Sequence, residues 1–222
     1  MQRLRIRFSR SEELKFISHL DIIRLWERAL RRAHIALAYS EGFSPHPRIS
    51  LAAPLSVGIT SDVELMDVVL AGQVSPHWFA ASVNQQLPAG MRVLEAYMIA
   101  PGIPSLQAQV RFARYEVDVE TDKDTEEIEE VVSNLLSKEH LPWYHMRDTG
   151  RRNYDLRALI DDVRVVGCDD SRCTIEMMLR CDNSGSGRPE QVTVALGFNE
   201  QPISIRRTEL VLSTRKRSHI RG

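Results

Sequence analysis

The sequence has few cysteines: three among 222 residues, with no two spaced as Cys-x-x-Cys. An odd number without that spacing fits a reducing compartment and lacks the four ligands of a structural zinc site. Cys168 and Cys173 flank a predicted hairpin turn and Cys181 follows, so we expect ordinary strand cysteines. We therefore predict no metal and no cofactor.

Long apolar runs are also lacking. No stretch approaches the roughly 18 apolar residues that a membrane span requires. Residues 3–8 alternate arginines with Leu4, Ile6 and Phe8, so this segment lacks the apolar core of a signal peptide. These absences predict a cytoplasmic protein with no membrane partner.

Net charge is nearly absent, at −1 from 29 Lys+Arg and 30 Asp+Glu, which excludes a globally basic nucleic-acid binder. The charges are nevertheless segregated. Arginine is concentrated in residues 3–48 and 205–221, and glutamate in residues 116–130. This distribution is compatible with a local basic face that binds nucleic acid.

Residues 18–34 predict an amphipathic helix with a charged outer face. Ser18, three residues before Asp21, has the spacing of a capping box. Apolar side chains fall on one arc of the helix. The opposite arc holds Asp21 and four arginines: Arg24, Arg28, Arg31 and Arg32. Glu27 offsets only part of that charge, so the helix is predicted to present an arginine face.

The segment from Tyr39 to Arg48 predicts a stiff polar loop, because its two prolines fix φ and keep the residues before them extended. The loop delivers His46 and Arg48 near a helix end. We predict that Arg48 completes one phosphate-reading surface with the four helix arginines. Tyr39 or Phe43 would stack on bases at its edge.

Other interpretations of this region stay open. The arginine face could dock an acidic protein or could simply be solvated. His19, Asp21 and His46 could instead supply the general base, orienting carboxylate and acid of an RNA-cleaving or RNA-modifying centre. However, Asp21 is already explained as a helix cap, and one helix turn plus a loop is little support for an active site. We therefore lean toward a protein that is not an enzyme.

The predicted elements follow the order strand, helix, strand, strand, helix, strand in each half. They cover residues 4–8, 18–34, 48–53, 62–70, 76–87 and 91–99, then 111–120, 124–137, 163–168, 173–180, 188–197 and 203–212. This order predicts an α+β protein of two tandem ferredoxin-like (βαββαβ) modules with antiparallel sheets. The modules span residues 1–102 and 103–222, the second with an insert at about 141–160 and a basic C-terminal tail.

The insert mixes aromatic and basic residues. Its members Tyr144, Arg147, Arg151, Arg152 and Tyr154 have the composition of a surface that stacks bases and neutralises phosphates. A strand pair that packs its aromatic rings inward explains the same residues equally well.

Several segments carry a family resemblance. SHLD at Ser18–Asp21, then ERALRR and YSEGFSPHPRISLAAPLSVG, with DLRALI at Asp155–Ile160 and RRTEL at Arg206–Leu210, resemble the signature of a bacterial family known as radical SAM-linked proteins. The likeness covers nearly all of the chain. Because members are typically encoded beside, or fused to, a radical SAM protein, the resemblance implies such a protein as partner. The family has no established reaction, so no catalytic residues carry over.

The chain lacks the three-cysteine motif of a radical SAM centre, so the cluster and S-adenosylmethionine would belong to the partner. Together with the arginine distribution, this predicts a non-catalytic RNA-binding or substrate-presenting accessory protein that works with a radical SAM protein. The alternatives are an enzyme using His19 and His46, or a subunit that only docks on its protein partner. Substrate, RNA identity and oligomeric state do not follow from the sequence.

Overall fold

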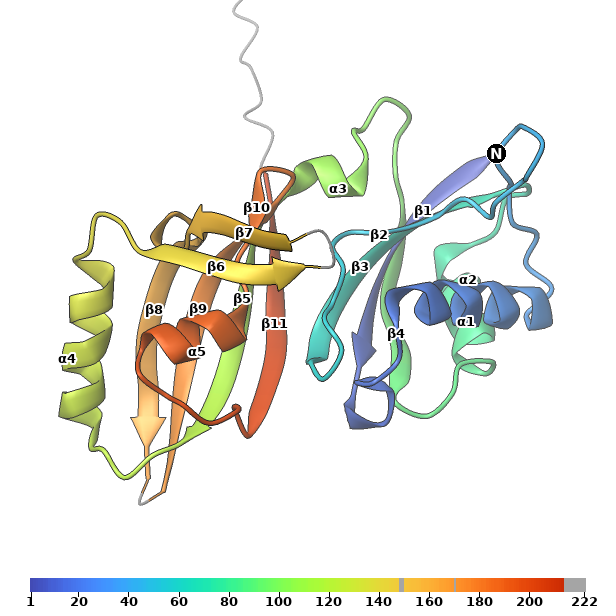
Figure 1. The fold of residues 1–222 in the computed structure, drawn as a ribbon. Coiled ribbons are helices and arrows are strands. Elements are labelled where there is room, and N and C mark those ends of the chain that lie inside the picture. Colours follow the sequence, from blue (N-terminus) through green and yellow to red (C-terminus); the bar gives the residue numbers. More distant parts are fainter. Residues whose placement is uncertain (148–149, 170, 214–222) are drawn as a thin grey trace, which may run out of the picture.

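The computed structural model describes residues 1–147, 150–169 and 171–213, with Met146 and Arg147 described by their backbone alone. Within these residues the chain forms one nine-stranded sheet, a separate two-stranded ribbon and five α-helices (Figure 1). The predicted basic tail lies outside the described residues. No described helix is both long enough and apolar enough to span a membrane.

The helices and strands follow the predicted order in both halves. The first half contains β1 (Gln2–Arg10), α1 (His19–Arg32), β2 (Ile49–Leu51), β3 (Thr60–Leu70), α2 (Pro76–Asn84) and β4 (Met91–Met98). After a linker and α3 (Leu106–Gln109) come β5 (Val110–Glu120), α4 (Thr125–Leu136), β6 (Pro142–Arg147), β7 (Gly150–Asp155), β8 (Ile160–Cys168), β9 (Arg172–Asp182), β10 (Gly185–Ser186), α5 (Pro189–Ala195) and β11 (Ser204–Leu212). Short 3₁₀ helices cover Glu12–Leu14 and Arg157–Leu159.

The sheet has the strand order β10-β9-β5-β11-β3-β1-β4, with β2 also on β3 and β8 also on β9. Among the described strand pairs only β11 with β3 is parallel, so the predicted mixed α+β class with mostly antiparallel strands is confirmed. The prediction of separate sheets differs from the structure. The pairing of Arg206 with Thr60 and of Arg207 with Ser61 joins both halves into one sheet.

The helices of both halves cover the same face of this sheet. α1 and α2 pack on the first-half strands and α4 and α5 on the second-half strands, and the pairing of Ser61 with Arg207 and of Arg207 with Tyr115 places both cores on one face. The alternation of residues in β1 explains which face of the first-half strands the helices cover. Leu4, Ile6 and Phe8 enter the core under α1, and the arginines between them point to the other face. Each half therefore has its own apolar core and one sheet face without helices of its own half.

A buried ion pair reinforces the joint between the halves. Arg207 of β11 donates to both carboxylate oxygens of Glu64 on β3, at 2.5 and 2.6 Å from Nη2, and both residues are buried. The same guanidinium donates to the carbonyls of Ala53 and Pro54. Burial alone would lower the pKa of Arg207, but the Glu64 carboxylate raises it above the ordinary value. Arg207 is therefore charged, and its hydrogen bonds to Glu64 fix β11 against β3.

The cysteines differ from the prediction. Cys168 and Cys173 are direct cross-strand partners on β8 and β9, which brings their Cα atoms within 4.0 Å, and a disulfide joins them. Cys181 is free, and burial raises the pKa of its thiol. Because that thiol is buried and protonated, it is a packing residue of the second core.

Candidate functional site

Ser18 caps the amino terminus of α1 as the sequence predicts, but the Asp21 carboxylate binds the Ser18 hydroxyl and not the Ser18 amide, so the predicted capping box is only half formed. The Ser18 hydroxyl accepts a hydrogen bond from the Asp21 amide at 3.3 Å and donates to the Asp21 carboxylate at 2.7 Å. The apolar arc of the helix is buried, and Trp26 packs edge-on against Phe8 with ring centroids 5.0 Å apart. This packing turns the opposite arc of α1 to solvent.

We define the arginine face as Arg24, Arg28, Arg31 and Arg32, all of which are exposed on α1. Arg24 pairs with Asp21 at 3.1 Å and Arg31 with Glu27 at 2.9 Å, one turn away in each case. Arg32 donates to the carbonyl of Gln86 at 2.5 Å, and Arg28 has no hydrogen-bond partner within the described chain. The face therefore carries two cations without an acidic partner and two that are partly neutralised.

The loop after α1 is closed by its own backbone. Tyr39 and Pro47 form a β-bridge, the Ser40 amide donates to the His46 carbonyl at 2.9 Å, and the His46 amide donates to the Ser40 hydroxyl at 3.0 Å. Phe43 is fully exposed and Tyr39 is 44% exposed. Both rings are therefore accessible to a ligand.

Arg48 does not lie on the arginine face, contrary to the prediction. It directly precedes β2, where Ile49 and Leu51 enter the core under α1, so alternation points Arg48 and Ser50 to the opposite face of the sheet. There Arg48 lines a cavity together with Arg3 and Asp67. The sheet thus divides the predicted five-arginine surface into two separate sites.

This cavity, which we name the Arg48 cavity, has a volume of about 500 Å³. Three parts of the chain enclose it: the loop and β2, the open face of β1 and β3, and the start of α3. Their polar lining residues include Arg3, His46, Arg48, Ser50, Asp67 and Ser105. A volume of this size suits a small-molecule ligand, and the cavity unites the predicted residues His46 and Arg48.

Positive charge exceeds negative charge at this cavity. Arg3 and Arg5 both donate to the single carboxylate of Asp67, from Arg3 Nη2 at 2.5 Å and from Arg5 Nε at 2.8 Å. Burial would lower the pKa of Arg5, but its hydrogen bonds to Asp67 raise it, so Arg5 is charged. The Arg48 guanidinium has only a 3.8 Å contact with the sulfur of Met1. Two guanidiniums therefore share one anion, and a third has none among the described residues.

The candidate catalytic residues are not brought together. His19 lines a second, much smaller cavity with Arg10 and Glu64, whereas His46 lines the Arg48 cavity, and no described cavity contains both. The Ser18 hydroxyl, followed by Arg24, lowers the pKa of Asp21, which fits an ionised helix cap. Among the described residues no three His, Cys, Asp or Glu side chains are placed to hold a metal ion. The enzyme interpretation gains no geometric support.

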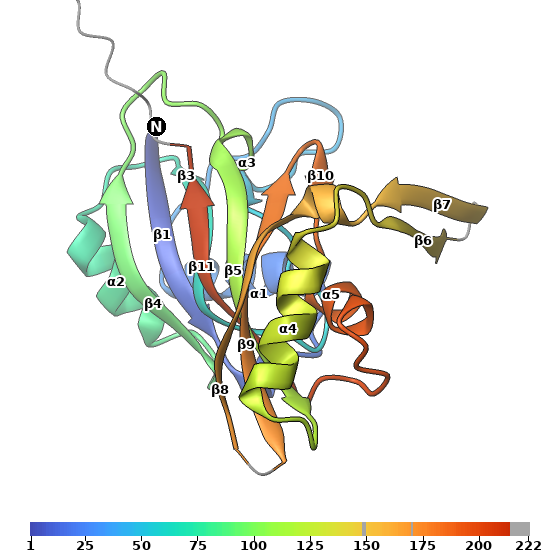
Figure 2. The same cartoon turned by 90° about the vertical axis from the view of Figure 1, so that its left-hand side faces the viewer.

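The insert forms the ribbon β6–β7, which projects from the body of the protein (Figure 2). On one face Trp143 and Tyr154 pack against the second core, and the Tyr154 hydroxyl donates to Gln191 Oε1 at 2.6 Å. On the other face Arg151 lies over the ring of Tyr144, 3.8 Å from its centroid, and Tyr144 is 52% exposed. The inward packing of aromatic rings is thus confirmed for one face of the ribbon, and the other face presents an exposed tyrosine beside an arginine.

Sequence reasoning missed Arg3, Asp67 and Ser105 as lining residues of a site. The available signal was the alternation of β1, which places Arg3 and Arg5 on one face, and an acidic residue, Asp67, directly between Met66 and Val68 in β3. Neither signal says which strands are adjacent, so the cavity could not be assembled from them.

The fold resembles that of one protein in a solved complex. The structure described as "Crystal Structure of a Cbf5-Nop10-Gar1 Complex" matches 93% of this chain and 48% of its own with a TM-score of 0.53 and 10% identity. The "Crystal structure of the archaeal box H/ACA sRNP Nop10-Cbf5 complex" gives a TM-score of 0.48 at 10% identity, over 94% of this chain and 48% of that one. The chain spans about half the length of these proteins, and the first match supports the mixed α+β fold alone.

Sequence comparison gives a direct assignment. No curated protein matches this sequence. Residues 3–189, which include α1, the loop, β2, β3 and the ribbon, match a family described as conserved in bacteria. The chain therefore belongs to the family "Uncharacterized protein conserved in bacteria (DUF2344)".

Proposed function

We propose that this protein is a non-catalytic RNA-binding or substrate-presenting accessory protein that works with a radical SAM protein. The observation that carries the RNA part is the arginine face, four exposed arginines on a helix whose other side is locked into a core. The partner rests on the resemblance of the segments around Ser18, Tyr39 and Arg206 to radical SAM-linked proteins. We interpret the two halves as ferredoxin-like modules on the basis of their strand orders, β4-β1-β3-β2 and β11-β5-β9-β8.

Arginine is the residue type that suits this role. Its planar fork can grip a phosphate with two hydrogen bonds and can lie flat on an exposed base. Arg28 makes no hydrogen bond within the described part of the chain, and the intrahelical partners of Arg24 and Arg31 are an exposed and a half-buried carboxylate, so a phosphate can replace them at little cost. These contacts would give salt-dependent affinity without sequence specificity.

The ribbon supports the same function independently. The outer face of β6–β7 presents an aromatic ring, Tyr144, with a guanidinium already stacked on it, that of Arg151. An exposed aromatic ring beside cations is a platform for bases of an unpaired strand, worth about 1–3 kcal/mol per stacked base. The opposite face is anchored through Tyr154, which holds this platform on a fixed stem.

The direct test reverses charge on the arginine face. The double variant Arg24→Glu/Arg28→Glu should weaken binding to a mixed-sequence single-stranded RNA oligonucleotide, and the slope of log affinity against log salt should fall by roughly 0.7 per lost contact. Arg92→Glu/Lys123→Glu is the matched control, because it makes the same change in net charge at exposed residues of β4 and the turn before α4. The control should bind like wild type.

Unchanged RNA affinity and slope in the α1 double variant would overturn the RNA proposal. If the same variant instead loses association with the radical SAM protein while RNA binding stays as it was, the arginine face is a protein-docking surface. Measuring both bindings on the same samples across one salt series separates these outcomes.

A further inference from the structure

The Arg48 cavity goes beyond the RNA proposal, because it lies on the sheet face opposite the arginine face and shares no residue with it. We propose that it binds a small phosphorylated ligand of nucleotide size, with the phosphate at Arg48. Four properties of the cavity favour such a ligand: its charge, its free donors, its shape and the rigidity of its frame.

The charge of the cavity favours an anion. Asp67 is the one acidic residue among its described lining residues, and two arginines already occupy that carboxylate. Arg3 and Arg5 therefore leave a net positive charge beneath the cavity, and Arg48 adds a further charge at its side. In a partly desolvated site this field attracts an anionic group more strongly than it would in water.

The free donors belong to the loop side of the cavity. The Arg3 guanidinium already makes four hydrogen bonds, to Asp67 and to the carbonyls of Ile103 and Pro104, so its main contribution to the cavity is charge. Arg48 makes no hydrogen bond to an oxygen of the described residues, and Ser50 and His46 line the same space. A bidentate guanidinium with further donors around it matches the oxygens of a phosphate.

Most of the remaining lining is apolar and suits the body of the ligand. Val69 and Leu106 face the cavity beside the polar residues. Its volume of about 500 Å³ exceeds what a lone phosphate ion needs and is in the usual range for small-molecule sites. An anionic end against Arg48 and a flat, weakly polar body against the apolar side chains describe a nucleoside monophosphate.

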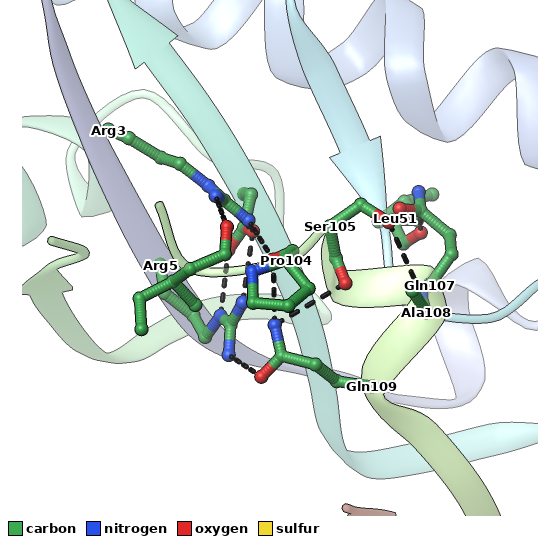
Figure 3. A network of polar contacts seen from close by, with 10 residues as sticks. Arg3, Arg5, Leu51, Pro104, Ser105, Gln107, Ala108 and Gln109 are labelled. Atoms are coloured by element: carbon green, nitrogen blue, oxygen red, sulfur yellow. Dashed lines mark hydrogen bonds and ion pairs between the residues drawn. The ribbon is translucent and has the colours of Figure 1, made fainter. Parts of the chain in front are cut away.

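The frame of the cavity is tied together before any ligand binds (Figure 3). The linker that closes one side is held by Arg3, which donates to the Ile103 and Pro104 carbonyls at 2.8 and 2.9 Å. Gln107 donates to the Leu51 carbonyl of β2 at 2.7 Å, and Gln109 donates to the Pro104 carbonyl at 2.8 Å. Because these bonds connect β1, β2 and α3, the walls are pre-organised and binding requires little ordering.

Two sources could supply such a ligand, a free nucleotide or the 5′-terminal nucleotide of an RNA. Titrations should use each of the four nucleoside 5′-monophosphates, the matching nucleosides, and one RNA oligonucleotide with either a 5′-phosphate or a 5′-hydroxyl. Amide NMR signals report the site: those of Ser50, Val69 and Ser105 should shift, while those of residues 24–32 should not shift with a mononucleotide.

We expect at least one monophosphate to bind and its nucleoside to bind at least about tenfold more weakly. Arg48→Gln should weaken binding of the monophosphate by a similar factor, whereas Arg92→Gln, which lies outside the cavity, should leave its affinity unchanged. If the RNA with a 5′-phosphate binds more tightly than the monophosphate, the natural ligand is an RNA end. If the monophosphate binds more tightly, the natural ligand is a free nucleotide. If no monophosphate and neither RNA end shifts the cavity amides, the proposal is wrong, whatever the arginine face does with RNA.

Discussion

The two halves of the molecule differ in how the arginines on the open faces of their strands are paired with acidic residues. In the second half, arginines of that face are paired with acids across neighbouring strands: Arg114 with Glu176 and Glu209, Arg164 with Glu176, Arg172 with Asp118, and Arg206 with Asp62 and Glu116. In the first half, Arg3 and Arg5 share one carboxylate, and Arg48 pairs with none of the acids in the part of the chain that the structure describes.

This difference shows how arginines that alternate along strands in the same sequence pattern acquire different roles. A cross-strand acid neutralises an arginine and makes it part of the sheet, at a modest gain in stability. An arginine in excess of its acids holds charge that a ligand can use. The pairing partner and not the residue type therefore distinguishes a structural charge from a binding charge, and the following experiments test that distinction.

The largest effect is expected at the joint between the halves. Arg207→Met should lower the free energy of unfolding by about 5 kcal/mol, because it leaves the buried Glu64 carboxylate without its partner. Arg206→Met is the neighbouring control, whose pairs are exposed, and should cost about 1 kcal/mol or less. Urea unfolding followed by circular dichroism measures both. Equal losses in the two variants would refute a special role for the buried pair.

The next effect concerns the core beneath the arginine face. Trp26→Ala should cost about 4 kcal/mol, since the ring is fully buried against Phe8. Ile128→Ala in the second core makes the parallel truncation, at about 3 kcal/mol. Monitoring both by urea unfolding shows whether the joint makes the two cores unfold in one transition. A Trp26→Ala protein with the wild-type midpoint would contradict the packing of α1.

A smaller effect distinguishes the paired face by its acid sensitivity. Burial would raise the pKa of Asp118, but hydrogen bonds from Ser204, Thr174 and Arg172 lower it below the ordinary 3.8. Its contribution to stability is therefore complete above that value and is lost as the pH falls through the lowered pKa.

When the pH is lowered from about 6 to about 3, the free energy of unfolding of Asp118→Asn should therefore fall by about 1 kcal/mol less than that of wild type. Asp122→Asn, at an exposed residue of the following turn, should keep the wild-type dependence. The measurement is the urea midpoint at a series of pH values. Parallel profiles for wild type and Asp118→Asn would show that this pairing contributes nothing.

The smallest effect separates the two faces of the ribbon. Tyr154→Phe removes the hydrogen bond to Gln191 and should cost about 1 kcal/mol. Tyr144→Phe keeps the exposed ring and should change stability by less than about 0.5 kcal/mol. Thermal unfolding of both variants tests this. A larger loss for Tyr144→Phe would mean that the outer face is structural and not a binding platform.

Local features were the predictable part of the fold. The cap at Ser18 and the spacing of apolar residues give α1 within two residues of its bounds, and Asp124 with Glu127 forms the capping box that begins α4. Such features depend on residues three or four apart, where the helix itself fixes the geometry.

Relations between distant strands were not predictable. Arg207 and Glu64 are 143 residues apart, and nothing in either neighbourhood indicates that β11 pairs with β3. The placement of Arg48 with the α1 arginines was wrong for a related reason. Proximity along the chain suggested one surface, whereas the alternation Arg48, Ile49, Ser50, Leu51 places the sheet between them.

The central position of β11 has a consequence for biosynthesis. This strand is the last described one along the chain, yet it lies between β3 and β5. While the ribosome is still producing residues 121–203, the edges of β3 and β5 that β11 will occupy have no partner, and unpaired edges invite association with other chains. The sheet that joins the two halves therefore cannot be completed until β11 has been synthesised. A nascent chain that stops before Ser204 exposes the edges of both β3 and β5.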